Sequence, residues 1–460
     1  MPPPTAAVMT PVTSVPHRHG GWLPKNRAVM IDWLKNLVRE IDRRDEAPLL
    51  PNEVDDLRKL IESRPDLRML ASAMLSEVPN KEPYINDPVG NRQIRDIDHL
   101  LQLFGVVMTE KAPEWSQKGY DVGLIGFPFN TVLDWPMATP SGYAFFLKPE
   151  VNEKMQAILN AWRDELLKTS DSQYVITTEE NKWLSPPALK AIEDDTNVDG
   201  KERKFQDLFV CDPVADPVHW GFTSWDSFFV RQFRNIDTLR PVASPGSPEI
   251  VANACESKPY ARQTKVNRRD SFWLKGQPYS LSEMLDGHAW TDTFVGGTVY
   301  QAFLSATSYH RWHSPVAGNV IRTAVLRGTY FSEPTITGFY DGNTPDPAAP
   351  DQAQGYITHV AARAIFFIEA EPPVGRLCLI FVGMADVSSC EILKKFKTGK
   401  PTRVEKGEEI GMFHHGGSTH CVLFRKGINV DFVAGADPET AKKNLALRAK
   451  LGTVTVVGDA

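Results

Sequence analysis

The spacing of apolar residues changes part-way along the chain, and this change limits the folds open to it. Between about residues 21 and 170, apolar side chains recur at steps of three and four, as at Met30, Leu34 and Leu37. This period is typical of amphipathic helices that bury one face. In the second half, β-branched and aromatic runs of strand length replace it, such as TVYQAFL at 298–304. The sequence therefore predicts an α+β fold in which a helical N-terminal domain precedes a β-rich domain.

Composition divides the 460 residues into four segments. A stretch containing Pro and Thr opens the chain, and a polar stretch around SPPALKAIEDDTNVDGKER separates the helical part from the strands. Such stretches are typical of tails and linkers. We therefore expect a disordered tail at 1–20, a helical domain at 21–170, a linker at 171–223 and a β-rich domain at 224–460.

Two further stretches interrupt these patterns. FPFNTVLDWP at 127–136 is expected to break the helical pattern, because proline lacks the backbone N–H that a helix interior needs. The stretch 332–355 is longer than an ordinary connection, so we expect a mobile loop or lid there.

Charge and composition exclude several classes of protein. The 51 basic and 57 acidic residues give a net charge of −6, which offers no general attraction to nucleic acid. Nowhere do as many as about 18 apolar residues run together, so we expect no stable membrane insertion. The five cysteines include no CxxC pair, and the N-terminus lacks the features of a secretory signal. These features favour a reduced, cytoplasmic setting.

Signatures of nucleotide and metal binding are missing from the sequence. It contains no GxxxxGK[ST], GxGxxG or HExxH motif. His310 and His313 lie three residues apart, a spacing that metal-binding histidines can have, but no third ligand is evident nearby. We therefore expect no metal site.

The most unusual local chemistry lies in the run FHHGGSTHC at 413–421. A serine-hydrolase elbow would read GxSxG, but His420 occupies the fifth position. Consecutive glycines allow backbone angles that other residues avoid, and they leave the Gly417 carbonyl open to attack by a hydroxyl such as that of Ser418. The alternative is a glycine turn that joins two strands.

Together with this run, several segments resemble the pyruvoyl-dependent phosphatidylserine decarboxylase family. Its members carry an LGST or GGST motif, here Gly416 to Thr419, and a YHRxH motif upstream, here Tyr309 to His313. The resemblance extends through SWDSFFVRQF, the Arg-Pro pair at 240–241, KGQPYSL and KGEEIGMF, and covers about half the chain. The N-terminal GWLPKNRAV segment and ACESKPY are more specifically similar to the soluble fungal branch of tryptophan decarboxylases. The segment 224–460 is therefore expected to be the catalytic domain.

The resemblance implies that the chain is a zymogen that cleaves itself between Gly417 and Ser418. Ser418 would attack the Gly417 carbonyl, and elimination and hydrolysis would leave a pyruvoyl group, formed from Ser418, as the cofactor in place of pyridoxal phosphate. This ketone would form a Schiff base with the substrate amine and accept electrons during decarboxylation. The resulting α and β fragments are expected to remain associated.

The resemblance also implies roles for individual residues. His313 takes the place of the base that activates the serine, and Glu256 of the CES segment lies where the family has an aspartate partner for that base. His310 is the candidate that returns a proton to the substrate, and the Thr419 hydroxyl is expected to steady the cleavage-site backbone. The alternative for either histidine is a hydrogen-bonded core residue, and for Glu256 a surface or ion-paired carboxylate.

Two enzyme readings follow from this resemblance. A lipid-acting enzyme should carry a membrane-docking face, whereas an amino-acid decarboxylase needs only a closed pocket. Trp312, where lipid enzymes commonly carry a small aliphatic residue, would add an aromatic wall beside a planar substrate, or it could pack in the core. We expect a carboxy-lyase for a small-molecule aromatic L-amino acid, tryptophan first, that releases the amine and carbon dioxide. A phosphatidylserine decarboxylase making phosphatidylethanolamine and an uncleaved, non-enzymatic scaffold are the alternatives.

Overall fold

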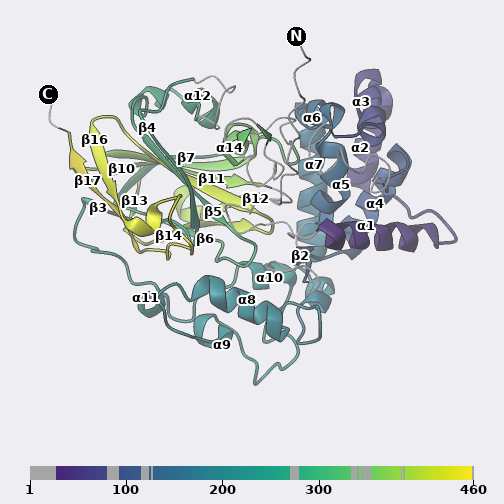
Figure 1. Ribbon diagram of the computed structural model, residues 1–460, viewed down its shortest axis with the longest axis horizontal. Helices are drawn as coiled ribbons and strands as arrows, with labels where there is room; N and C mark the ends of the chain where they lie inside the picture. Colours follow the sequence, from purple (N-terminus) through teal and green to yellow (C-terminus); the bar gives the residue numbers. More distant parts are fainter. Residues whose placement is uncertain are drawn as a thin grey trace, which may run out of the picture.

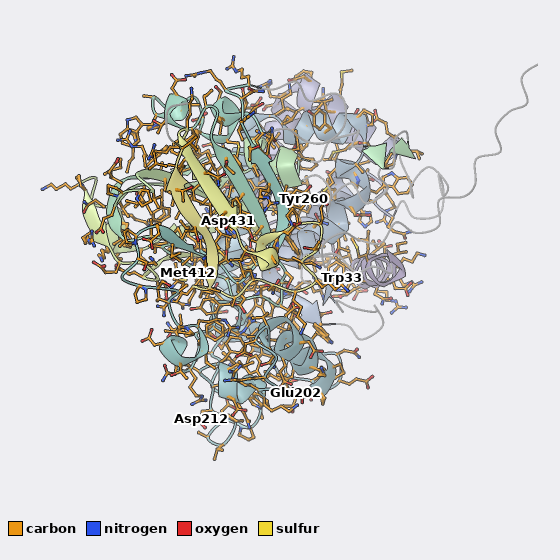
Figure 2. All side chains as sticks on the ribbon, turned by 60° about the vertical axis from the view of Figure 1, so that its left-hand side comes forward. Trp33, Glu202, Asp212, Tyr260, Met412 and Asp431 are labelled. Carbon is orange, nitrogen blue, oxygen red and sulfur yellow. The ribbon has the colours of Figure 1, made fainter. Side chains whose placement is uncertain are left out.

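The fold combines a helical unit, a β-rich unit and a smaller helical lobe (Figure 1). The computed structural model describes residues 27–79, 93–115, 124–125, 128–269, 279–332, 339–340, 344–345, 354–384, 386 and 389–457. The expected tail at 1–20 lies outside these residues, and so does most of the expected lid at 332–355. In Figure 2, Trp33 lies on the helical unit, Glu202 and Asp212 lie on the lobe, and Tyr260 lies on the β-rich unit. Helices precede most of the strands, which confirms the α+β class.

The N-terminal unit is a stack of helices whose predicted apolar positions face inward. Met30, Leu34, Val54 and Leu57 are all buried, as their spacing predicts. The helices are α1 (Arg27–Asp42), α2 (Asn52–Ser63), α3 (Pro65–Ser76), α4 (Ile97–Glu110), α5 (Pro128–Met137), α6 (Pro140–Phe146) and α7 (Pro149–Ala161), and a π-helical turn (Trp162–Leu167) follows. Between α4 and α5 lie two short paired strands, β1 (Glu114–Trp115) and β2 (Leu124–Ile125).

Helix α5 corrects one expectation, because it occupies the stretch that was expected to interrupt the helices. Pro128 is its first residue, where a missing N–H costs little, and Pro136 lies next to its last residue. Every residue of the helix is buried. The two prolines therefore lie near the ends of the helix and do not break it.

The segment 171–223 also differs from the expected linker, because it forms part of a folded lobe. It contains most of a 3₁₀ helix (Ser170–Val175), α8 (Pro186–Thr196) and α9 (Phe205–Leu208), and α10 (Trp225–Phe229) and α11 (Ile236–Leu239) follow. Trp183, Phe205 and Leu208 are fully buried in this lobe. A few large apolar side chains therefore hold a segment whose average composition is polar.

An antiparallel seven-stranded sheet forms the centre of the β-rich unit. Its order is β13 (Thr402–Val404), β7 (Gly318–Leu326), β10 (Arg363–Ala370), β11 (Arg376–Gly383), β15 (Ser418–Phe424), β5 (Thr298–Leu304) and β4 (Lys258–Thr264). The central strands β11 and β15 are buried almost throughout. The apolar run of β11 is typical of a buried strand, whereas β15 also buries the polar residues Ser418, Thr419 and His420.

Two three-stranded sheets complete the unit. One has the order β12 (Ser389–Ile392), β14 (Glu409–His414) and β6 (Arg311–His313), and the other β16 (Ile428–Phe432), β17 (Lys450–Val456) and β3 (Ile250–Ala252). The remaining elements are α12 (Leu281–Met284), α14 (Gln354–Val360), the paired strands β8 (Phe339–Tyr340) and β9 (Thr344–Pro345), and 3₁₀ turns at Thr291–Thr293, Lys394–Phe396 and Ala434–Ala436. One hydrophobic core extends from the helical unit into the sheets. Among the described residues, no helix is long and apolar enough to cross a membrane.

Candidate active site

The predicted cleavage site lies where the chain passes from one sheet to another. Strand β14 belongs to a three-stranded sheet, β15 belongs to the seven-stranded sheet, and residues 415–417 connect them. His415 has a φ of 29° and Gly416 a φ of 104°. A positive φ suits glycine but costs a histidine roughly 1–3 kcal/mol. The backbone is therefore strained directly before the Gly417–Ser418 bond.

Hydrogen bonds to neighbouring strands fix this bond in place. Ser418 pairs with Gly383 of β11 on one side and with Leu304 of β5 on the other. The Gly417 carbonyl accepts a hydrogen bond of 2.8 Å from the Met384 N–H. A donor in this position withdraws electron density from the carbonyl carbon and makes it easier to attack.

The Ser418 hydroxyl is buried and unused. Its exposure is 0%, and among the described residues its Oγ has no hydrogen-bond partner. Leaving a buried hydroxyl unpaired costs roughly 1–3 kcal/mol, so such a group calls for an explanation. A role of Ser418 as a nucleophile, directly after a polarised carbonyl, would explain the unpaired hydroxyl.

The Thr419 hydroxyl is held by β5. It donates a hydrogen bond of 2.9 Å to the Ala302 carbonyl and accepts one of 3.0 Å from Nε2 of Gln301. Gln301 in turn accepts a hydrogen bond of 2.5 Å from the Tyr279 hydroxyl. This buried network fixes the backbone immediately after Ser418.

His313 has the form of a neutral base. Its Nδ1 lies 2.8 Å from the Gly407 carbonyl, which can only accept, so Nδ1 carries the proton and Nε2 has a free lone pair. Nε2 has no partner among the described residues. Burial, followed by the charges of Arg448 and Arg311, lowers the pKa of His313 to about 3. The ring is therefore neutral at physiological pH, and the lone pair of Nε2 is not taken up by a proton.

His310 is also buried, in a loop that the helical lobe supports. Its ring stacks on Phe229 at a centroid distance of 3.9 Å, and its carbonyl accepts a hydrogen bond of 3.0 Å from the Phe413 N–H. Burial, with the nearby charge of Arg231, lowers the pKa of His310 to about 3. Its imidazole is thus neutral, like that of His313.

Two charged residues hold the loop that leads to His310. Asp195 of α8 accepts hydrogen bonds from the hydroxyls of Ser305, at 2.9 Å, and Thr307. Buried Arg231 donates to the carbonyls of Thr307, at 2.5 Å, and Ser308, at 3.1 Å. The segment expected to be a linker thus supports the loop that carries a candidate catalytic histidine.

Glu256 differs from the sequence expectation, because the structure pairs it with Arg240 and not with His313. Arg240 donates bonds of 2.9 Å from Nε and 2.5 Å from Nη2 to the two carboxylate oxygens. The Leu447 N–H donates a third, at 2.8 Å. The two charged side chains are 1% and 2% exposed, so the ion pair is fully buried. This geometry makes Glu256 a structural anchor.

Replacing Glu256 with alanine is therefore expected to lower the free energy of unfolding by about 3–5 kcal/mol, because Arg240 would keep a buried charge without its partner. Urea unfolding of the uncut chain, in a Ser418→Ala background, measures this difference. Asp66→Ala is the matched control, since it breaks an exposed pair with Arg64 and should reduce the free energy of unfolding far less. Equal losses in the two variants would contradict the anchoring role.

Trp312 is a core residue in this structure and not a pocket wall. It is 0% exposed and stacks in parallel on Phe381 at a centroid distance of 4.1 Å. Phe413 contacts it edge-on at 4.7 Å. Aromatic packing occupies both its face and its edge, which favours the core-packing alternative for Trp312.

Sequence reasoning missed a charged cluster around the buried His414, next to the cleavage turn. His414 Nδ1 lies 2.8 Å from Asp226 of α10, and its Nε2 lies 2.8 Å from Glu391 of β12. Burial opposes the charged form of His414, but the two carboxylates raise its pKa above the ordinary value. The partners are 188 and 23 residues away, so no local motif could have shown the cluster.

Among the described residues, no group of side chains could hold a metal ion.

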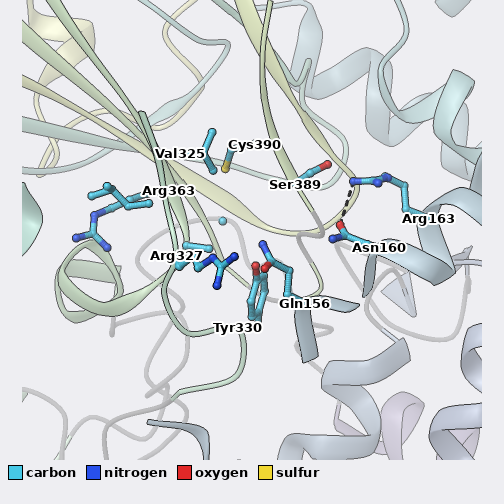
Figure 3. A pocket seen from close by; sticks show the side chains of 12 residues that line it. Gln156, Asn160, Arg163, Val325, Arg327, Tyr330, Arg363, Ser389 and Cys390 are labelled. Carbon is cyan, nitrogen blue, oxygen red and sulfur yellow. Dashed lines mark hydrogen bonds between the residues drawn. The ribbon is translucent and has the colours of Figure 1, made fainter. Parts of the chain in front are cut away.

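A cavity of about 320 Å³ lies between the helical unit and the sheet. It is lined by residues of α7, β7 and β12 and by Gly383, which pairs directly with Ser418. Figure 3 shows Gln156, Arg327 and Tyr330 close together at this cavity, and Asn160 hydrogen-bonded to Arg163. The cavity therefore reaches the strand position next to the predicted cleavage site.

Two sequence profiles, both described as phosphatidylserine decarboxylase, match residues 51–192 and 225–444. Decarboxylase iboD of Amanita muscaria is 39% identical over 306 residues, which cover 65% of this chain and 84% of that protein. This chain belongs to the phosphatidylserine decarboxylase family. The family is pyruvoyl-dependent and its members are carboxy-lyases, so this decarboxylase is an enzyme of that class.

Two further relatives of this decarboxylase carry a substrate in their names. The L-tryptophan decarboxylase of Psilocybe cubensis is 29% identical over 427 residues, which cover 90% of both chains. That of Psilocybe cyanescens is 34% identical over 313 residues, which cover 66% of this chain and 69% of that protein. The similarity to the Psilocybe cubensis enzyme thus includes most of the helical N-terminal unit.

Proposed function

We propose that this chain cleaves itself at Gly417–Ser418 and then decarboxylates an aromatic L-amino acid, tryptophan first, to the amine and carbon dioxide. The observation that carries the proposal is the buried Ser418 hydroxyl, which has no hydrogen-bond partner among the described residues and directly follows the polarised Gly417 carbonyl. The relatives named L-tryptophan decarboxylase support the choice of substrate.

Self-cleavage uses groups of this chain alone. We assign the uptake of the Ser418 hydroxyl proton to Nε2 of His313, although these two atoms form no hydrogen bond with each other in the structure. Oγ of Ser418 then attacks the Gly417 carbonyl carbon. The C–N bond breaks and an ester forms. Loss of the α-proton of Ser418 then expels the Gly417 carboxylate, and the dehydroalanine that remains takes up water and releases ammonia. The products are a β fragment of 417 residues and an α fragment of 43 residues that begins with a pyruvoyl group.

The sheet explains how the fragments would stay together. The α fragment would begin with β15, which pairs with β11 on one side and with β5 on the other. It would also contribute β17, which pairs with β3 of the other fragment. These ladders and the buried face of β15 do not depend on the broken peptide bond.

During turnover, the pyruvoyl ketone supplies an electron sink for the electron pair that decarboxylation leaves behind. His310 is our candidate for the group that delivers a proton to the α-carbon of the product. Burial of the site keeps bulk water from supplying competing protons.

The cavity beside Gly383 is our candidate for the substrate site. Its volume lies near the lower limit of about 300 Å³ for small-molecule pockets, which suits a free amino acid better than a two-chain phospholipid. Tyr330 offers an aromatic ring, while Gln156 and Arg327 offer polar contacts.

The five cysteines are free thiols, which supports a reducing compartment such as the cytoplasm.

Carbon dioxide release from purified protein tests this proposal. Tryptophan, tyrosine and phenylalanine are compared with vesicles that contain phosphatidylserine, all without added pyridoxal phosphate. We expect turnover of the free amino acids, highest with tryptophan, and little release from the vesicles. Release from the vesicles alone would support the phosphatidylserine decarboxylase alternative and contradict the proposed substrate.

A further inference from the structure

Asp386 connects the helical unit to the loop beside the cleavage site. Its side chain is fully buried, and its carboxylate accepts hydrogen bonds from the N–H groups of Phe129, at 3.0 Å, and Asn130, at 2.9 Å. Both donors belong to the first turn of α5, about 256 residues earlier in the chain. The first turn of a helix presents N–H groups that its own carbonyls cannot satisfy, so a carboxylate from another unit fits there.

The backbone at Asp386 has an uncommon conformation. Asp386 has a φ of 56°, in the left-handed region that few non-glycine residues adopt. Burial raises the pKa of the Asp386 carboxyl, and the two N–H groups of α5 act in the opposite direction. Such a conformation persists only where the surroundings hold it, and here α5 supplies the bonds.

Met384 lies two residues before Asp386 and touches the scissile bond. Its N–H donates the 2.8 Å hydrogen bond to the Gly417 carbonyl, just beyond the end of β11. When Ser418 attacks, this carbonyl oxygen becomes negatively charged, and a fixed donor stabilises the charge. A single donor of this kind is typically worth about 10²–10³ in rate. The position of the Met384 N–H therefore affects the rate of self-cleavage.

We infer that Asp386 is a positioning residue for self-cleavage, through which the first turn of α5 holds the Met384 N–H against the Gly417 carbonyl. The inference rests on the proposed self-cleavage and gives the N-terminal helical unit a part in maturation. Asp386 itself exchanges no proton and forms no covalent bond in this step.

Cell-free translation with a radioactive label tests the inference in the full-length chain. The conversion of uncut chain into fragments is followed over time on denaturing gels, and size-exclusion chromatography identifies the folded fraction. In that fraction, Asp386→Ala is expected to cleave about 10- to 100-fold more slowly than the wild type. Asp386→Asn keeps one acceptor oxygen, so its cleavage rate should lie between those of Asp386→Ala and the wild type.

Two matched variants separate positioning from general stability. Thr139→Ala removes a buried cap of α6, whose hydroxyl accepts a 3.0 Å bond from Gly142, within the same helical unit. Met384→Ala keeps the backbone N–H. Both are expected to cleave at nearly the wild-type rate. A purely structural role for Asp386 would instead give Asp386→Ala and Thr139→Ala the same rate in their folded fractions.

Hydroxylamine identifies the affected step, because it cleaves an ester once the ester has formed. If Asp386→Ala slows the attack on the Gly417 carbonyl, hydroxylamine will leave its rate low. Two results for Asp386→Ala would overturn the inference without affecting the proposed self-cleavage of the wild type. One is fast cleavage once hydroxylamine is added, and the other is a wild-type rate without hydroxylamine. A wild-type chain that stays uncut would instead contradict the proposed self-cleavage itself.

Discussion

Ser418→Ala protein is expected to remain a single chain of 460 residues and to show no decarboxylase activity. Alanine has no hydroxyl to attack the Gly417 carbonyl, so neither the cleavage nor the pyruvoyl group can arise. Because Oγ of Ser418 has no hydrogen-bond partner among the described residues, its removal should leave the uncut fold at least as stable. Denaturing gels, a carbon dioxide assay and urea unfolding measure the three effects.

Ser172→Ala is the control for the removal of a buried serine hydroxyl. The Ser172 hydroxyl is buried too, but it donates to the carbonyls of Leu167 and Thr169 and accepts from the Trp225 N–H. Its loss should reduce stability by roughly 1–3 kcal/mol and leave cleavage intact. Normal cleavage of Ser418→Ala at this bond would rule out Ser418 as the nucleophile.

Replacing His313 with glutamine is expected to slow self-cleavage by about 10²–10⁴-fold, the usual contribution of a general base. The glutamine amide can still donate to the Gly407 carbonyl, which His313 Nδ1 contacts at 2.8 Å, but it cannot take the serine proton at neutral pH. The rate of fragment formation in cell-free translation measures this loss.

His99→Gln is the control for the loss of a buried imidazole, because His99 lies in α4 of the helical unit. It should cleave like the wild type. Since the pKa of His313 is lowered to about 3, its base form persists in mildly acidic solution, and protonation of this ring should not slow cleavage there. A His313→Gln chain that matures at the wild-type rate would contradict the assignment of the base.

Local patterns were enough to predict much of the fold. The strand runs at β5 and β10 coincide with the observed strands, and the apolar steps of α1 and α2 face the core. Prediction failed at α5, because its two prolines lie near the helix ends, where they do not break the helix. It failed at 171–223 as well, because few but large buried side chains organise a polar segment.

The residues of the candidate site, too, could be predicted from the sequence only in part. Gly417, Ser418 and His313 stand in short motifs, so the sequence could single them out. The partner of Glu256 and the packing of Trp312 depend on contacts across the fold, and both differ from expectation. The Met384 N–H is a backbone group that any non-proline residue would supply, so its role leaves no mark in the sequence.

The intact mass of the purified wild-type polypeptides tests the central claim most directly. Self-cleavage predicts two polypeptides of 417 and 43 residues, the smaller one beginning with a blocked pyruvoyl group in place of Ser418 and giving no Edman signal. An active preparation in which all molecules have the mass of the uncut 460-residue chain would contradict it.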